Sequence, residues 1–210
     1  MGMARQPSFE LLGSNRFVPV VTFASAADAV PVGRALLAGG VGVIEVTLRT
    51  PAGLEALRAL KAEVPDIVLG AGTVLSDAQA RDAAEAGARF MVSPGHTDTL
   101  IGVAKDVGLP WMLGATTLSE AMTLREHGFL VQKFFPAEPS GGTAVLKAIG
   151  SVLPDVKFCP TGGITVDTAK SYLDLPNIVA VGGSWFVPAT NIDLAKVTEA
   201  ARRASTSLAA

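Results

Sequence analysis

The chain has 210 residues, and its 17 Lys and Arg nearly balance its 19 Asp and Glu, which leaves a formal net charge of −2. This balance disfavours proteins that bind nucleic acid or an anionic membrane surface through charge, and no uninterrupted apolar stretch reaches the length of a membrane span. The single cysteine, Cys159, cannot form a disulfide within the chain, so we expect a protein of the reducing cytoplasm.

Short apolar runs rich in β-branched residues alternate with Ala-rich amphipathic stretches from residue 17 to the end of the chain. The apolar runs predict eight strands, at residues 17–23, 43–48, 67–72, 89–92, 110–113, 129–134, 156–159 and 178–181. The amphipathic stretches predict helices at residues 26–38, 52–63, 76–86, 97–107, 118–127, 143–149, 165–173 and 193–204. The cap positions agree, because Ser76 and Thr97 suit helix N-caps, and Gly87 and Gly108 suit the left-handed position that follows a helix.

This alternation favours an α/β protein whose parallel sheet is buried on both faces. The leading prediction is a single (β/α)8 TIM barrel that occupies residues 1–210 as one domain, with a short N-terminal helix before Phe17 that plugs or flanks the bottom of the barrel. The alternative is an open doubly wound sheet. It is disfavoured because GAGTVL (70–75), the best candidate for a dinucleotide-binding turn, lacks the third glycine.

In the second predicted strand, polar and apolar residues alternate. Glu45, Thr47 and Arg49 share one face of the strand, and that polar face must look into the barrel. Glu45 and Arg49 could form a buried structural ion pair. They could instead be a general base beside an anion-binding group, since the planar guanidinium fits a carboxylate.

Lys133 ends the sixth predicted strand, within VQKFFP (131–136). A lysine usually marks a solvated face. Here phenylalanines and a proline surround it, and desolvation disfavours the ammonium form, which would free an amine to attack a carbonyl. Glu45 nearby would favour the charged form, so the sequence leaves the balance between the two effects open.

Two glycine-containing turns follow the last two predicted strands, PTGGI (160–164) and VGGSW (181–185). Glycine pairs are common in loops, but these two occupy the places where barrel enzymes bind phosphate with backbone N–H groups and a helix N-terminus. The pairing favours a phosphorylated ligand. The only histidines, His96 and His127, are too scattered for a zinc site, whereas a magnesium site built from Glu and Asp stays open. Cys159 is interpreted as a packing residue.

Six segments, in order along residues 18–189, resemble those of the 2-keto-3-deoxy-6-phosphogluconate (KDPG) aldolase family. They are IEVTLRT (44–50), GAGTV (70–74), VSPG (92–95), KFFPAE (133–138), FCPTGGI (158–164) and GGSW (182–185). The resemblance implies a (β/α)8 barrel, a homotrimer, no cofactor and no metal. It also implies a Schiff-base aldolase of the Entner-Doudoroff pathway that cleaves KDPG to pyruvate and glyceraldehyde 3-phosphate and acts on 4-hydroxy-2-oxoglutarate.

The resemblance implies a catalytic role for two residues and a substrate-binding role for nine. Lys133 would form the iminium, and Glu45 would move protons. The substrate-binding positions would be Arg49 and Thr73 for the pyruvate carboxylate, Thr161 near the aldehyde fragment, Gly162, Gly163 and Ser184 for the phosphate, and Pro94, Phe135 and Gly183 elsewhere in the pocket.

Other functions stay open at this point. A metal-dependent pyruvate aldolase or a phosphosugar isomerase would need carboxylate ligands in place of an essential lysine, and a phosphosugar-binding barrel could lack catalysis altogether. The chain departs from relatives at LGATT (113–117) and at Gln132. Among aldolases, the sequence does not separate KDPG from its galactonate epimer or from 4-hydroxy-2-oxoglutarate.

Overall fold

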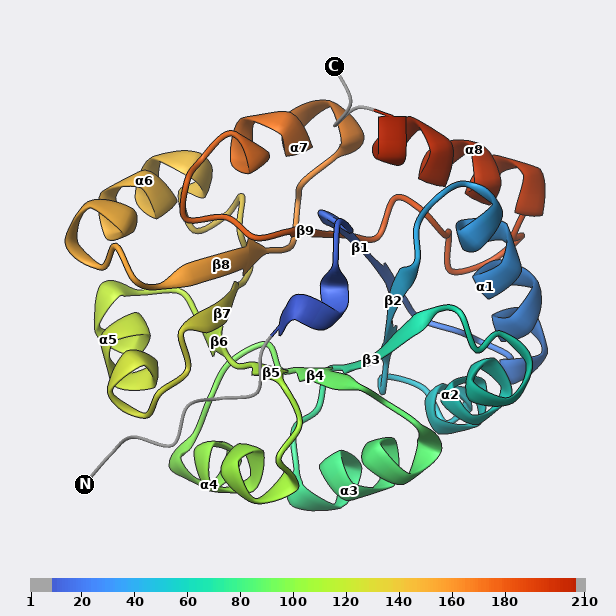
Figure 1. Cartoon of the computed structure of the whole chain (residues 1–210), viewed down its shortest axis with the longest axis horizontal. Helices are drawn as coiled ribbons and strands as arrows, with labels where there is room; N and C mark the ends of the chain where they lie inside the picture. The colour runs from blue at the N-terminus through green and yellow to red at the C-terminus, as the bar shows by residue number, and fades with distance from the viewer. Residues whose placement is uncertain (1–8, 207–210) are drawn as a thin grey trace.

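The computed structural model describes residues 9–206, in which parallel strands form two sheets surrounded by helices (Figure 1). One sheet has six strands in the order β5-β4-β3-β2-β1-β9, and the other has three in the order β6-β7-β8. The strands are β1 (Phe17–Val21), β2 (Val43–Thr47), β3 (Val68–Gly72), β4 (Phe90–Val92), β5 (Trp111–Met112), β6 (Gly114–Ala115), β7 (Val131–Phe134), β8 (Lys157–Pro160) and β9 (Val181–Gly183). The α/β class predicted from the sequence is therefore confirmed.

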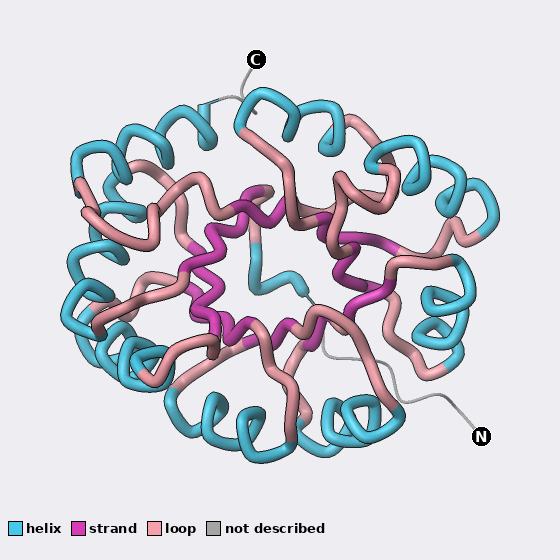
Figure 2. The backbone as a smooth tube through the Cα atoms, turned by 180° about the vertical axis from the view of Figure 1, so that it is seen from behind, coloured by secondary structure: helices cyan, strands magenta, loops and turns pink. Residues whose placement is uncertain are grey.

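The helices lie outside the strands, as the view from behind also shows (Figure 2). They are α1 (Ala29–Ala38), α2 (Ala52–Glu63), α3 (Asp77–Ala86), α4 (Asp98–Val107), α5 (Leu118–Glu126), α6 (Gly142–Val152), α7 (Val166–Leu173) and α8 (Leu194–Thr206). The chain also forms two short 3-10 helices, η1 (Phe9–Leu12) and η2 (Ala26–Asp28). Ser76 and Thr97 cap α3 and α4 through their side chains, and Gly87 and Gly108 follow these helices in the left-handed conformation, as predicted.

The predicted strand at residues 110–113 is confirmed as β5, but the short strand β6 that follows it was not predicted. The chain forms β5, which pairs with β4, and after Leu113 forms β6, which pairs with β7. Gly114 explains the break, because a β-carbon there would overlap the backbone carbonyl of Pro94. The Leu113 carbonyl still accepts a 3.0 Å hydrogen bond from the backbone N–H of Lys133, so the chain changes partner at this residue.

The last strand also lies later than predicted. Residues 178–181 were expected to form it and Gly182 and Gly183 to form the turn, but β9 includes both glycines. Their missing side chains are required there, since a β-carbon on Gly182 would overlap Thr161 and one on Gly183 would overlap the Trp185 ring. An isolated bridge between Thr161 and Gly182 links the end of β8 to β9.

The expected N-terminal helix is η1, which lies across the middle of the ring of strands in Figure 1. Phe9 packs edge-on against Phe90 at the start of β4, with ring centroids 6.5 Å apart, and Leu12 is buried. Downstream, the Asn15 side chain accepts a hydrogen bond from the Gly42 N–H just before β2. This segment therefore covers the end of the ring at which the strands begin.

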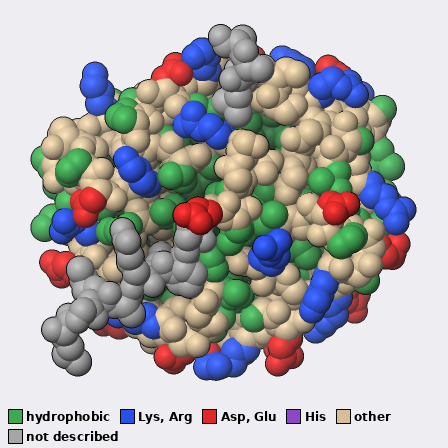
Figure 3. Space-filling model, viewed as in Figure 1, with side chains coloured by type: hydrophobic (Ala, Val, Ile, Leu, Met, Phe, Trp, Pro, Cys, Tyr) green, Lys and Arg blue, Asp and Glu red, His purple; other side chains and the backbone are tan. Residues whose placement is uncertain are grey.

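The described surface has mixed charge. On the face seen in Figure 3, Lys and Arg side chains are interspersed with Asp and Glu, in keeping with the small net charge. Within residues 9–206, no helix combines the length and apolarity needed to span a bilayer.

Candidate active site

A lysine and a glutamate from distant strands meet inside the ring. Lys133 on β7 and Glu45 on β2 approach to 3.2 Å between Nζ and Oε1, and each residue is only 2 % exposed. The inward orientation predicted for Glu45 is confirmed, but its partner is Lys133 and not Arg49. A buried ion pair is costly to desolvate and is weak evidence for stability, so this pair is a candidate functional site.

Glycine at position 72 makes room for the Glu45 carboxylate. Gly72 on β3 stands beside Thr47 in the register of β2 and β3, and a β-carbon on it would overlap Glu45. Thr47 itself is fully buried and shares a 2.8 Å hydroxyl–hydroxyl hydrogen bond with Thr22, which follows β1. The space left by Gly72 is therefore what admits the Glu45 carboxylate, and the Thr47–Thr22 bond joins β2 to the residue that follows β1.

Lys133 lies in a largely apolar environment. Its Nζ atom is 5.3 Å from the centroid of the Phe135 ring, and its strand neighbours are Gly114 and Cys159. Burial, together with the negative charge of Glu45, raises the pKa of the Cys159 thiol to about 12. The thiol stays protonated at neutral pH, which supports its interpretation as a packing residue and leaves Lys133 as the candidate nucleophile.

Arg49 and Thr73 form a second polar group where β2 and β3 end. Arg49 is exposed, and its Nε donates a 3.0 Å hydrogen bond to Oγ1 of Thr73. Thr73 holds a φ of 58°, an unusual value for a β-branched residue, and such strain is concentrated at functional sites. The rest of the guanidinium fork remains able to bind a carboxylate.

The turn after β8 presents a hydroxyl and two glycines. Oγ1 of Thr161 is buried beside Cys159 and Gly182, and it hydrogen-bonds to no nitrogen or oxygen atom of residues 9–206. Gly162 and Gly163 follow with φ values of 101° and 80°, in the left-handed region that favours glycine. Gly162 also packs against Phe135, since a β-carbon there would lie 3.2 Å from its ring.

Ser184 follows β9 and is exposed at the mouth of a cavity of about 440 Å³. The bridge between Thr161 and Gly182 brings the ends of β8 and β9 together. The sequence therefore correctly placed the two glycine-containing segments side by side, although only the first forms a turn at its glycines.

The remaining sequence candidates have structural partners. Pro94 packs its carbonyl against Gly114, and a ring nitrogen of His96 lies 2.8 Å from the Gly114 carbonyl oxygen. No three His, Cys, Asp or Glu side chains in the described part of the chain come together where they could hold a metal ion.

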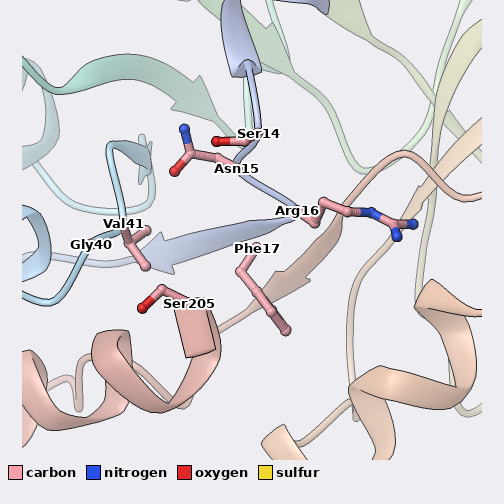
Figure 4. Close-up of a pocket in the computed structure, with 7 residues that line it drawn as sticks. All are labelled: Ser14, Asn15, Arg16, Phe17, Gly40, Val41 and Ser205. Atoms are coloured by element: carbon pink, nitrogen blue, oxygen red, sulfur yellow. The ribbon is translucent and has the colours of Figure 1, made fainter. Parts of the chain in front are cut away.

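Another cavity, of about 240 Å³, lies near the start of β1 (Figure 4). Two of its polar side chains are held by the surrounding backbone: Asn15 bonds to Leu12 and Gly42, and Ser205 bonds to Gly39. The Arg16 side chain points away from the others and donates to two backbone carbonyls of the α7–β9 segment.

Sequence reasoning missed one interaction beside the Gly162–Gly163 turn. The hydroxyl of Tyr172 on α7 donates a 2.6 Å hydrogen bond to Oε1 of Glu138, which follows β7. Glu138 ends the KFFPAE segment (133–138), which the sequence analysis singled out, but nothing in the spacing indicates Tyr172 as its partner.

Comparison with known proteins points to one family. A family profile described as "Aldolase: KDPG and KHG aldolase" matches residues 10–201. The KHG/KDPG aldolase of Escherichia coli is 43% identical over 197 residues, which cover 92% of each chain.

Two crystal structures are similar over nearly the whole chain. The KDPG aldolase of Zymomonas mobilis with 3-phosphoglycerate is 45% identical, covers 93% of both chains and superimposes with a TM-score of 0.90. The KDPG aldolase of Legionella pneumophila, with pyruvate captured at low pH as a covalent carbinolamine intermediate, is 42% identical. It covers 91% of this chain and 95% of its own, with a TM-score of 0.88.

Proposed function

The chain belongs to the KDPG and KHG aldolase family, and from that membership we propose how its residues carry out the reaction. It is a Schiff-base aldolase that cleaves KDPG reversibly to pyruvate and glyceraldehyde 3-phosphate, and it also acts on 4-hydroxy-2-oxoglutarate (KHG). The observation that carries the proposed roles is the buried contact of 3.2 Å between Lys133 and Glu45. It joins a nucleophile and an acid/base where the strands of both sheets converge.

The two sheets and their helices are proposed to form one (β/α)8 barrel, and residues 1–210 one domain; residues 1–8 and 207–210 lie outside the described part of the chain. The partner change at Leu113 links β5 to β6, and the Thr161–Gly182 bridge links β8 to β9. Counted this way, β5 and β6 are one interrupted strand of an eight-stranded barrel.

Lys133 begins the reaction. A proton passes from its ammonium to Glu45 across their hydrogen bond, and the neutral amine attacks the C2 ketone to give a carbinolamine. Glu45 returns this proton to the carbinolamine hydroxyl and becomes a carboxylate again, and loss of water leaves an iminium on Nζ. Its positive charge draws the electron pair of the C3–C4 bond as that bond breaks, and the Phe135 ring lies 5.3 Å from Nζ.

Glu45 moves the protons. Directly or through a water, its carboxylate takes the C4 hydroxyl proton, so the C4 oxygen becomes the aldehyde carbonyl as the C3–C4 electron pair forms an enamine. The same group then returns a proton to C3. Water hydrolyses the resulting iminium, which releases pyruvate and restores Lys133.

Arg49 and Thr73 would hold the pyruvate carboxylate, supported by their mutual hydrogen bond of 3.0 Å at the strand ends. At the other end of the substrate, Gly162, Gly163 and Ser184 would bind the phosphate. Thr161 would offer its buried hydroxyl, which lies beside Cys159, between the two ends. Pro94, Phe135 and Gly183 would complete the pocket. Binding energy from the phosphate positions the reacting bond, so part of it is expressed in turnover.

Gly163→Val tests the phosphate site. Valine disfavours the φ of 80° and would bring its β-carbon to 2.7 Å from Cβ of Glu138, so the turn must shift. We expect KM for KDPG to rise much more than KM for KHG, which has no phosphate. Steady-state kinetics with both substrates measures this, and equal damage to both would place the phosphate elsewhere.

Gly72→Ala tests whether the position of Glu45 governs turnover. The added β-carbon overlaps the carboxylate and must displace it, so we expect kcat to fall by roughly 10²-fold, the scale of an ångström's misplacement. Borohydride trapping of pyruvate on Lys133 should persist, which separates displacement of Glu45 from unfolding. Gly102→Ala is the matched control, because a β-carbon on this helix glycine meets nothing within 4 Å. Unchanged kcat in a folded Gly72→Ala would contradict the assignment.

KDPG is proposed as the physiological substrate within the Entner-Doudoroff pathway, and the alternative is an aldolase specific for the galactonate epimer. The epimers differ in the direction of one hydroxyl, so kcat/KM measured with each of them decides between the two. The family consists of aldolases, so the alternative of a phosphosugar-binding barrel without catalysis has no support.

The enzyme is further proposed to be a cytoplasmic homotrimer. The trimer is supported by the family resemblance, and the cytoplasm by the single, buried cysteine. Sedimentation equilibrium tests the first proposal, and a dimer or monomer at micromolar concentration would contradict it.

A further inference from the structure

The loop after β7 and the turn after β8 are joined by main-chain hydrogen bonds. The N–H of Ala137 donates to the Thr161 carbonyl at 2.8 Å, and the N–H of Glu138 donates to the Gly162 carbonyl at 3.0 Å. The pairing of β7 with β8 therefore continues past both strand ends. Any shift of Glu138 is transmitted directly to the Gly162–Gly163 turn.

Glu138 is in turn held from the helix layer. Tyr172 on α7 is 1 % exposed, and its hydroxyl donates the 2.6 Å hydrogen bond to Oε1 of Glu138. Burial, with the bond to Glu138 as the next cause, raises the pKa of the Tyr172 phenol, so the phenol remains a donor at neutral pH. Gly163 lies against the same side chain, since its β-carbon would stand 2.7 Å from Cβ of Glu138.

We propose that the Tyr172–Glu138 hydrogen bond positions the Gly162–Gly163 turn and thereby sets the affinity for phosphorylated substrates. This inference rests on the proposed phosphate site. Neither residue touches the substrate in this proposal: both are positioning residues that act through the turn. Glu138 is exposed and negatively charged, so beside a phosphate it would weaken binding unless its geometric role outweighed the repulsion.

Three variants test the role of the bond. Tyr172→Phe removes the hydroxyl and keeps the buried ring, Glu138→Ala removes the acceptor, and Glu138→Gln keeps an acceptor oxygen while removing the charge. We expect Tyr172→Phe and Glu138→Ala each to raise KM for KDPG about five- to tenfold, with KM for KHG changed less than about twofold. Glu138→Gln should restore the parental KM ratio of the two substrates. Because the two residues act through one bond, the double variant Tyr172→Phe/Glu138→Ala should be no worse than either single variant.

Ser171→Ala is the matched control on α7. The Ser171 hydroxyl bonds only within its own helix, to the Thr168 carbonyl, so both KM values should stay parental. Thermal unfolding of each variant separates a loss of stability from a shift of the turn.

The inference is overturned if Tyr172→Phe leaves the KM ratio unchanged, whatever it does to stability. It is also overturned if Glu138→Ala lowers KM for KDPG, since charge repulsion would then be the main role of Glu138. Gly163→Val separates the positioning role of the Tyr172–Glu138 bond from the existence of the phosphate site. A changed ratio in Gly163→Val with an unchanged ratio in Tyr172→Phe refutes only the positioning role, whereas unchanged ratios in both variants refute the phosphate site itself.

Discussion

Replacing Lys133 with arginine is expected to abolish cleavage of KDPG, with a loss of roughly 10⁴-fold or more in kcat. Arginine keeps the positive charge and can still pair with Glu45, but its guanidinium does not deprotonate and cannot form an imine. The charge is conserved, but the site is only 2 % exposed and the guanidinium is bulkier than the ammonium. Circular dichroism must therefore show native secondary structure before the loss of activity is assigned to the chemistry.

The amine itself can be identified by trapping. Borohydride added together with pyruvate should reduce the iminium and fix a pyruvate-derived group on Lys133, which peptide mass spectrometry locates. Activity should disappear in parallel, and a chelator should have no effect. Lys105→Arg is the matched control, because Lys105 is an exposed lysine on α4. An unmodified Lys133, with activity lost to chelator and restored by a divalent ion, would overturn the Schiff-base assignment of this residue.

The sequence predicted local features of the site better than distances within it. Alternation in β2 placed Glu45 on the inner face, and apolar neighbours marked Lys133, because both properties depend on a few adjacent residues. The contact between them joins positions 88 residues apart, and strand order around the ring decides it. The sequence left two interpretations of Glu45 open, an ion pair with Arg49 on the same strand or a general base, and considered Glu45 close to Lys133. The structure shows that the ion pair is with Lys133 on β7.

The same limit explains the errors in the fold. Ser76 and Thr97 were correctly predicted as N-caps, since capping depends only on the cap residue and the first turn of the helix that follows it. The break at Leu113 and the inclusion of Gly182 in β9 depend on what packs against a glycine: the Pro94 carbonyl in one case and Thr161 in the other. No periodicity within one segment contains that information. The bond from Tyr172 to Glu138 was missed for the same reason, because it crosses from a helix to a loop.

Replacing Glu45 with glutamine is expected to lower kcat for KDPG by roughly 10²-fold or more, the usual scale for removing a positioned acid/base. Glutamine has nearly the same shape, so the space beside Gly72 stays filled and the fold should persist. Lys133 keeps its amine, and borohydride should still trap pyruvate on it. The variant therefore separates iminium formation from the proton transfers that follow.

The proton transfers can be measured without cleavage. NMR in deuterated water follows the exchange of the pyruvate methyl protons for deuterium. This exchange requires an iminium and a base that removes a C3 proton, and no carbon–carbon bond is broken. Glu45→Gln should slow it in proportion to cleavage, whereas Glu55→Gln, at an exposed position on α2, should leave both rates unchanged. Near-parental cleavage and exchange across the pH range would remove Glu45 from the mechanism. Normal exchange with slow cleavage would instead limit its role to the C4 hydroxyl, since a second group would then have to serve C3.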